Sequence, residues 1–353
     1  MSKRTLIIIG AAVTFIIASI FLFPTFLLFL ESRKESINKS TVVFIVKSPI
    51  SLEDLAQELE KNGVIDDPSS FVKVGEYKDL SKESIALGLY RIEPATQYRT
   101  LLNGFKLNDL GNGNGESEVE VTFTNGNTIN DLAGKLSKQL LIDSSAFVSY
   151  VTAKETGKMY GFSLEELPAL FIPNTYKMYY DTDPKQFLVR MADSYKAFWT
   201  NERRDLLKGV GLQDPVEAVT LASIVYGEQS RNSQEWPRIA GLYLNRLKKG
   251  MKLQSDPTFR FCWGDQLNGV QRLLNVHRDI DCPYNTYKIN GLPPGPISLP
   301  PADVVDAILH PENHRYLFMM AKPDFSGLHD FSIEYADHQR FASVYQKWLS
   351  TLN

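Results

Sequence analysis

The chain is poor in cysteine: Cys262 and Cys282 are the only two among 353 residues. Two cysteines are too few for a disulfide framework or for a zinc site built from thiolates. The histidines also lack the close spacing that metal ligands show. They are His277, His310, His314, His329 and His338. We therefore expect neither a metal nor a cofactor.

An excess of charge of one sign is also missing. The chain has 38 Lys and Arg against 41 Asp and Glu, a net charge of -3. Its basic clusters, Arg203–Arg204 and Arg246–Lys249, are short and typical of solvated helix faces, so nucleic acid is not an expected partner. Ser223 lies in a helical pattern without the flanking glycines of a nucleophile elbow, which argues against a serine hydrolase.

One long hydrophobic run is present, at Thr5–Leu30, and it contains no charged residue. About 20 apolar residues suffice to cross a bilayer as a helix, so we expect an uncleaved single-pass helix in the plasma (inner) membrane. Lys3 and Arg4 favour a cytoplasmic tail at residues 1–4 and an extracytoplasmic remainder. Positive charges in the polar linker at residues 31–40 act against this orientation. A cleaved signal peptide is the alternative, but the run is too long and no cleavage site follows it.

Beyond the linker, the hydrophobic period alternates between strand-like and helix-like, which predicts an α+β fold. The order strand, helix, helix, strand is predicted for residues 41–108. A larger mixed α+β domain is expected over residues 118–353. The main predicted strands are Thr41–Val46, Ile85–Ile92, Glu118–Phe123, Tyr316–Met320 and His329–Phe331. The main predicted helices begin at Ser51 and Asp67 and cover Gln97–Phe105, Thr128–Leu141, Phe187–Trp199, Pro301–Leu309 and Tyr335–Leu349.

A further helix is predicted to run from Asp214, which is suited to cap it, to the neighbourhood of Glu228. Glu228 follows Leu221 by seven residues and Ile224 by four, which places its carboxyl on the same stripe as these apolar side chains. A carboxyl group on such a stripe is desolvated, and desolvation raises its pKa toward the range that a general acid needs. The alternative from periodicity alone is a surface glutamate at a fraying helix end beside Gly227.

A second helix is predicted from Pro237 to Lys249, with Gly250 as its C-terminal cap. A polar turn is expected at Gln254–Thr258, where Asp256 is suited to bond local amides. The two helices and the turn are expected to surround Glu228.

Four stretches of this region carry a family resemblance: Leu221–Gln229, Ile239–Thr258, Pro283–Tyr287 and Gly291–Ile297. In their order and their unusual residues they resemble the YceG-like family of endolytic murein transglycosylases. In that family the second glutamate of an Ile-[Ile/Val]-Glu-x-Glu run is catalytic, and Glu228 stands at its position. Tyr226 replaces the first glutamate, so the resemblance transfers no role to that position.

The resemblance implies a lytic transglycosylase that cuts the glycan strands of peptidoglycan internally. Glu228 would protonate the glycosidic oxygen between N-acetylmuramic acid and N-acetylglucosamine, and its carboxylate would then take the proton of the attacking C6 hydroxyl. The product carries a 1,6-anhydro end, and no second catalytic carboxylate is required, in contrast to ordinary glycosidases. The family's link to wall synthesis makes penicillin-binding peptidoglycan synthases expected partners.

Residues 41–108 resemble the LysM-like subdomain that this family carries before its catalytic part. A LysM-like fold suggests glycan binding, but a structural spacer without affinity for sugar is the alternative, since fold alone does not establish function.

Further residues in the matching motifs are weaker candidates for substrate binding: Asn245, Gln254, Ser255, Asp256, Thr258, Asn285 and Tyr287. Each either contacts the substrate or holds the wall of the site in shape; for Asn245 the structural role is a polar link between helices. Two alternative functions follow. One is a hydrolytic muramidase that uses Glu228 with Asp256. The other is a non-catalytic glycan-binding scaffold of the cell wall, in which Tyr226 marks lost activity.

Cys262 and Cys282 fall in the outward-facing part of the predicted topology, where an oxidising compartment permits a disulfide. Closing a loop of about 20 residues would contribute roughly 3 kcal/mol to stability in the chain-entropy model. The alternative is two separate thiols, because Cys262 lies between Phe261 and Trp263 and suits an ordinary core position.

Overall fold

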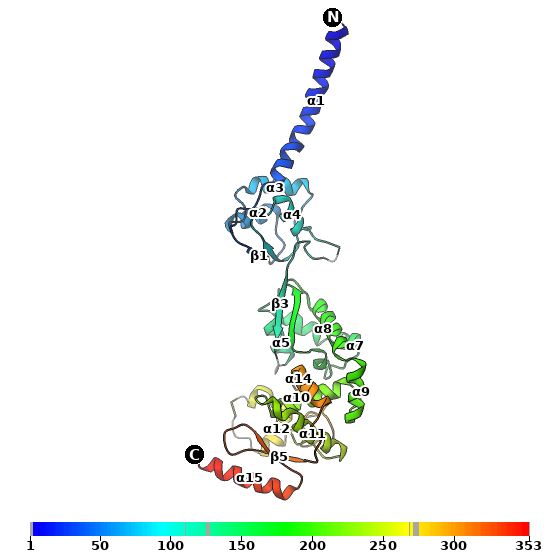
Figure 1. The fold of residues 1–353 in the computed structure, drawn as a ribbon, viewed down its shortest axis with the longest axis vertical. Coiled ribbons are helices and arrows are strands. Elements are labelled where there is room, and N and C mark those ends of the chain that lie inside the picture. Colours follow the sequence, from blue (N-terminus) through cyan, green and yellow to red (C-terminus); the bar gives the residue numbers. More distant parts are fainter. Residues whose placement is uncertain (1–2, 110, 125–127, 268, 271–274, 353) are drawn as a thin grey trace. The chain divides into compact units, whose positions relative to one another are not determined.

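A computed structural model describes residues 3–109, 111–124, 128–267, 269–270 and 275–352 (Figure 1). The fold mixes helices with small antiparallel sheets, as the sequence predicts. The chain divides into two compact units. The first comprises Met1–Val121, Gln139–Leu141 and Lys177–Thr182, and the second comprises Thr122–Lys138, Ile142–Tyr176 and Asp183–Asn353. The predicted boundaries at residues 41–108 and 118–353 stay predictions.

The apolar run near the N-terminus lies in helix α1, Lys3–Ser32, which contains Pro24. Many of its apolar side chains are exposed, among them Ile16, Phe23 and Leu30. Within the described part of the chain, however, no helix combines the length and the apolar character required to cross a membrane. The predicted membrane span is therefore not confirmed. Residues 1–2 of the predicted tail lie outside the described residues.

The first unit contains the predicted order strand, helix, helix, strand. Strands β1, Val42–Val46, and β2, Gly88–Ile92, pair antiparallel. Between them lie α2, Leu52–Lys61, and α3, Pro68–Tyr77, and α4, Tyr98–Phe105, follows. Side chains from all five elements close one core; its fully buried members include Leu55, Leu59, Phe71, Tyr98, Leu102 and Phe105.

Local sequence explains where the first helices of this unit begin. The Ser51 hydroxyl accepts the backbone N–H of Asp54 at 3.0 Å, and the Asp67 carboxylate accepts that of Ser70 at 2.9 Å. Each bond satisfies an amide that the helix itself leaves unpaired, which is why these residue types favour helix starts.

Strands β3, Glu118–Phe123, and β4, Asn174–Tyr179, pair with each other and contribute residues to both units. The predicted helix Thr128–Leu141 is too long, because α5 covers only Ile129–Leu136. Beyond α5 the backbone leaves the helix, and the amide of Leu141 donates to the carbonyl of Tyr180 instead of to a helical partner. Helices α6, Ser144–Val151, and α7, Lys154–Tyr160, and the 3-10 helix η1, Leu167–Leu170, complete this part.

The centre of the second unit is helix α10, Pro215–Glu228. It contacts α9, Asn201–Val210, α11, Trp236–Lys248, α12, Asp256–Trp263, and α14, Ala302–Leu309 (Figure 1). Every residue from Ala218 to Val225 is buried, so the predicted apolar positions Leu221 and Ile224 are confirmed and burial extends beyond their stripe. This middle part of α10 is surrounded by other helices and therefore has no solvated face.

The chain ends in a hairpin covered by a helix. Strands β5, Phe318–Ala321, and β6, His329–Ser332, pair antiparallel, and α15, Tyr335–Ser350, packs on both. The remaining elements are α8, Pro184–Phe198, α13, Asn275–Arg278, and the 3-10 helices η2, Ser233–Glu235, and η3, Gly264–Leu267.

Two arginines that the sequence places on solvated helix faces have internal partners. Arg203 donates three hydrogen bonds to Asp306 of α14, at 2.9 and 3.0 Å from Nη2 and at 3.1 Å from Nε. Arg246 is buried and donates to the carbonyl oxygens of Leu317, at 2.6 Å, and Leu253, at 2.9 Å. The guanidinium group has five N–H donors in a fixed fork, which suits it to bridging backbone segments.

Candidate functional site

Glu228 is the last residue of α10, and its partly exposed side chain opens into a cleft of about 1170 Å³. The walls of this cleft come from α11, the start of α12, the β5–β6 hairpin and α15. Its polar lining comprises Glu228, Tyr243, Arg246, Gln254, Asp256, Arg278, Tyr287, His329 and His338. Its apolar lining includes Leu242, Leu253, Phe318, Met319, Met320 and Leu349.

Two hydroxyl groups hold the carboxyl of Glu228 by the same oxygen. Tyr243 donates to Oε1 at 2.7 Å, and Ser255 donates to Oε1 at 2.5 Å. Oε2 accepts no hydrogen bond from the residues that the structure describes. When Glu228 is protonated, Oε1 therefore serves as the acceptor oxygen and the proton resides on Oε2, which is free to face the cleft.

Burial raises the pKa of Glu228, and the nearby charge of Asp256 adds to this effect. The hydrogen bonds from Ser255 and Tyr243 and the charge of His329 act in the opposite direction, but they are outweighed. The side chain consequently retains its proton at a higher pH than an ordinary glutamate. A single carboxylic acid held this way is suited to general acid chemistry.

Ser255 belongs to the predicted polar turn at Gln254–Thr258, but the structure begins helix α12 within that segment. Ser255 occupies the N-cap position of α12, yet its hydroxyl does not cap the helix. It donates to Glu228 instead, while its backbone N–H donates to Thr286 Oγ1 at 2.9 Å. The interaction with Glu228 thus replaces a helix cap, which by itself contributes about 1 kcal/mol.

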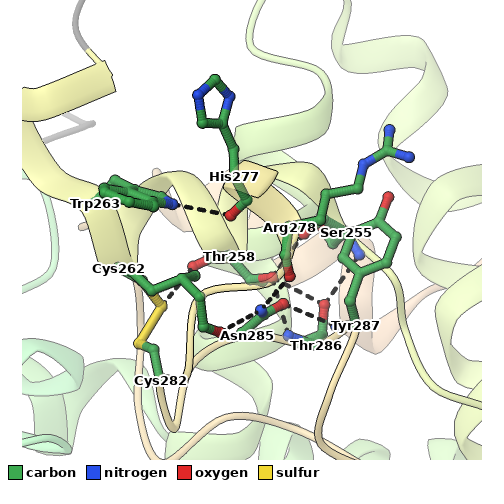
Figure 2. Close-up of a disulfide and its surroundings, with 11 residues drawn as sticks. Ser255, Thr258, Cys262, Trp263, His277, Arg278, Cys282, Asn285, Thr286 and Tyr287 are labelled. Carbon is green, nitrogen blue, oxygen red and sulfur yellow. Dashed lines mark hydrogen bonds between the residues drawn. A yellow bond between two sulfur atoms is a disulfide. The ribbon is translucent and has the colours of Figure 1, made fainter. Parts of the chain in front are cut away.

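Thr258 and Asn285 lie behind the cleft and are fully buried. Thr258 Oγ1 lies 2.9 Å from Thr286 Oγ1, and Asn285 Nδ2 donates to the carbonyls of Arg278 and Ile280 at 2.8 and 2.9 Å. Figure 2 shows this network beneath Ser255 and Tyr287. The polar atoms of these two residues are thus used inside the protein, and their predicted contact with substrate stays a prediction.

Gln254, Asp256 and Tyr287 line the cleft together with Glu228. The Tyr287 hydroxyl donates to Asp256 Oδ1 at 2.5 Å, and an Arg278 nitrogen lies 3.8 Å from the other carboxylate oxygen. Gln254 has a positive φ of 50°, an uncommon conformation for a residue with a side chain. Residues held in such uncommon conformations cluster at functional sites.

Asn245 is not brought to Glu228. Its Nδ2 donates to the carbonyl oxygens of His314, at 2.8 Å, and Tyr316, at 3.2 Å, so it ties α11 to the segment before β5. Its side chain lines a separate cavity of about 590 Å³. On a helix, Asn245 and Tyr243 point in different directions, and only Tyr243 faces the cleft.

Tyr243 and His329 are site residues that the sequence patterns do not indicate. Tyr243 lies inside the helix predicted from Pro237 to Lys249, and the available signal was that a buried tyrosine hydroxyl requires a hydrogen-bond partner. His329 lies in β6 and lines the cleft, although it follows Glu228 by about a hundred residues in the chain. No local sequence pattern predicts a role for it in the site. At the position of the family's first glutamate, Tyr226 packs its ring against Trp236.

Cys262 and Cys282 form a disulfide, with their Cα atoms 6.2 Å apart (Figure 2). The bridge links the end of α12 to the loop that carries Asn285 and Tyr287. Constraining a loop of 20 residues contributes about 3 kcal/mol in the chain-entropy model. It therefore stabilises the wall of the cleft at a distance from Glu228.

The fold and the site define an α+β protein whose central helix ends in a partly exposed carboxylic acid that opens into a large cleft. Comparison with known proteins gives the family. Residues 44–343 match the YceG-like family, and the chain belongs to it.

Individual curated proteins are also similar to this chain over most of its length. An endolytic murein transglycosylase of Bacillus subtilis strain 168 is 27% identical over 307 residues, which cover 82% of this chain and 81% of the relative. An endolytic murein transglycosylase of Streptococcus pneumoniae strain R6 is 22% identical over 311 residues, which cover 80% of this chain and 55% of the relative.

A solved structure supports the fold. The crystal structure of a Listeria monocytogenes protein described as yceG-like has a TM-score of 0.55 and 24% sequence identity to this chain. The match covers 86% of this chain and 99% of that chain.

The position of Glu228 depends on the residue before it. A Cβ atom at Gly227 would lie 2.7 Å from Cβ and 3.0 Å from Cγ of Pro257, whose ring cannot turn away. We predict that Gly227→Ala lowers the free energy of unfolding by about 1–3 kcal/mol, the usual cost of overpacking, measured by urea denaturation. The displaced α12 should also separate Ser255 from Glu228.

Gly209→Ala is the matched control, because Gly209 lies in α9 and a Cβ there has no neighbour within 4 Å. Alanine should stabilise that helix by up to about 1 kcal/mol. If both variants had the same stability, α12 would not require glycine at position 227.

Proposed function

We propose that the protein is an endolytic peptidoglycan transglycosylase. It cleaves the bond between N-acetylmuramic acid and N-acetylglucosamine inside glycan strands and leaves a 1,6-anhydro end. Support comes from its membership of the YceG-like family and from relatives named endolytic murein transglycosylase. The observation that carries the proposal is the carboxyl of Glu228, which opens into a cleft of about 1170 Å³ and accepts the hydrogen bonds of Tyr243 and Ser255 through Oε1.

The geometry suits one residue acting twice. The proton on Glu228 Oε2 passes to the glycosidic oxygen as the bond from C1 to that oxygen breaks. The C6 hydroxyl of the same muramoyl ring attacks C1, and its proton returns to the Glu228 carboxylate. Tyr243 and Ser255 stabilise this carboxylate between the two steps, because hydrogen bonds to a charged acceptor are stronger than neutral ones. Water is not consumed.

A hydrolytic muramidase is the second candidate, favoured by the position of Asp256. This carboxylate lines the same cleft as Glu228 and lies near enough to raise the pKa of Glu228 by its charge. A hydrolase of this kind uses two carboxyl groups. Asp256 is, however, already engaged by Tyr287 and lies near Arg278, which is the arrangement of a group that shapes the cleft.

Digestion of purified peptidoglycan tests the function. We predict that the wild-type protein yields fragments with 1,6-anhydro ends and that Glu228→Gln lowers the rate by about a thousandfold, because a general acid typically contributes about 10²–10⁴-fold. The amide oxygen can still accept the bonds of Tyr243 and Ser255, so the fold should be retained. Mass spectrometry identifies the new ends.

Glu202→Gln is the control, because Glu202 is an exposed carboxylate of α9 in the same unit. Reducing ends in place of anhydro ends would favour the muramidase. Binding of glycan by the wild type without any cleavage would favour the non-catalytic scaffold.

The raised pKa of Glu228 predicts a pH dependence. Only the protonated side chain can donate to the leaving oxygen, so the rate should fall as pH rises through the raised pKa, above the ~4.3 of an ordinary glutamate. Tyr243→Phe removes a hydrogen bond that lowers this pKa, so it should move the falling limb to higher pH. A limb near the ordinary value, unmoved by Tyr243→Phe, would contradict a desolvated Glu228. The measurement is the initial rate of anhydro-end formation.

We also propose finer features of organisation that rest on the sequence. The apolar run Thr5–Leu30 anchors the protein in the plasma membrane with residues 1–4 in the cytoplasm. Residues 41–108 form a LysM-like subdomain, residues 118–353 form the catalytic domain, and peptidoglycan synthases are partners. The exposed apolar side chains of α1 support the anchor.

We predict that the full chain stays with membranes in an alkaline carbonate wash and that a variant lacking residues 3–32 is released. Release of the full chain would contradict the anchor.

A further inference from the structure

His329 opens strand β6 and lines the cleft together with Glu228. Only 13% of its side chain is exposed, and Nδ1 lies 2.9 Å from Oε2 of Glu235. The backbone N–H of His329 donates to the other oxygen of the same carboxylate at 2.9 Å. Glu235 thus holds both the backbone and the ring of His329, so the orientation of the imidazole is fixed.

Glu235 is itself fixed by Gln229. The Gln229 amide donates to Glu235 Oε2 at 2.9 Å and to the carbonyl of Gly327 at 2.8 Å. The orientation of this amide is determined, because its oxygen accepts the backbone N–H groups of Arg231 and Asn232. Gln229 directly follows Glu228, so the network connects the end of α10 to the strand that carries His329.

The charge state of Glu235 determines the tautomer of His329. Burial raises the pKa of Glu235, but the hydrogen bonds from His329 and Gln229 outweigh it and lower the pKa overall. An ionised carboxylate only accepts hydrogen bonds, so Nδ1 of His329 carries a proton. In the neutral ring the other nitrogen, Nε2, is then an acceptor, and it forms no hydrogen bond with the residues that the structure describes.

If His329 served only to connect β6 to η2, any buried pair of polar side chains could replace it and Glu235. Two observations favour a functional role. The side chain of His329 lines the same cleft as Glu228, and Glu235 holds its Nδ1 at 2.9 Å, which leaves Nε2 without a partner among the described residues. A fixed acceptor beside an acid in a sugar-sized cleft suits a hydroxyl donor, and a glycan strand presents hydroxyl groups along its whole length.

We propose that His329 is a substrate-contacting residue whose Nε2 accepts a hydrogen bond from a glycan hydroxyl in the subsite beside Glu228, with Glu235 and Gln229 as positioning residues. This inference rests on the proposed function. It assigns recognition of the sugar to a residue that contributes no proton to the reaction.

Binding is tested separately from cleavage. Cleavage by the wild type is measured first, and its absence would contradict the proposed function. Affinity for soluble, uncross-linked glycan strands is then measured in Glu228→Gln protein, which cannot turn them over. We expect the added change His329→Ala to weaken binding about fivefold to tenfold, which corresponds to one lost hydrogen bond. His310→Ala, at an exposed histidine of the same unit, should leave the affinity unchanged.

A second variant separates contact from scaffolding. In Glu235→Gln the side-chain amide can donate to Nδ1, which would move the imidazole proton to Nε2 and turn the acceptor in the cleft into a donor. We expect the same loss of glycan affinity in a folded protein. The ¹⁵N shifts of the His329 ring should report the Nδ1-protonated form in the wild type and the opposite tautomer in the variant.

Addition of glycan strands should shift the His329 Nε2 resonance in the protein that keeps Glu235. An active wild type whose glycan affinity is unchanged by His329→Ala, or whose Nε2 resonance does not respond to glycan, would overturn the inference and leave the proposed function standing.

Discussion

The site depends on two hydrogen bonds, which two hydroxyl groups donate to the same carboxyl oxygen of Glu228. Tyr243 comes from α11 and Ser255 from the start of α12, and both donate to Oε1 of Glu228 at the end of α10. Three helices thus meet at one atom. Every residue of α10 from Ala218 to Val225 is buried, so the helix that carries Glu228 is anchored in the core. A site built on a packed helix keeps its side chains in place, as a preorganised acid requires.

Two sets of contacts support this arrangement. The buried Thr258, Thr286 and Asn285 fix the start of α12, and a disulfide closes the adjoining loop. Gln229 and Glu235 link the end of α10 to β6. Buried polar groups of this kind are costly unless each is paired, and here they are used to position side chains rather than to strengthen the core.

Sequence patterns predicted the elements whose signals are local. The caps at Ser51, Asp67 and Asp214 mark helices that the structure contains, because a cap requires only residues three positions apart. Patterns failed where packing decides. The polar segment before Thr258 resembles a turn, yet it begins α12, because the hydroxyl of Ser255 bonds Glu228 and the following residues continue as a helix. Asn245 belongs to a motif that suggests a site residue, but on α11 its side chain points away from the cleft of Glu228 and donates to the carbonyl of His314.

The sequence by itself determined the type of fold, the helix that ends at Glu228 and, through its motifs, the membership of the YceG-like family. Those properties depend on periodicity and on residue order, which a chain carries without folding. Only the tertiary structure decided that Tyr243 and Ser255 share one oxygen of Glu228 and that His329 faces the same cleft. These groups are far apart in the chain, and hydrogen bonds form only when packing brings donor and acceptor within about 3 Å.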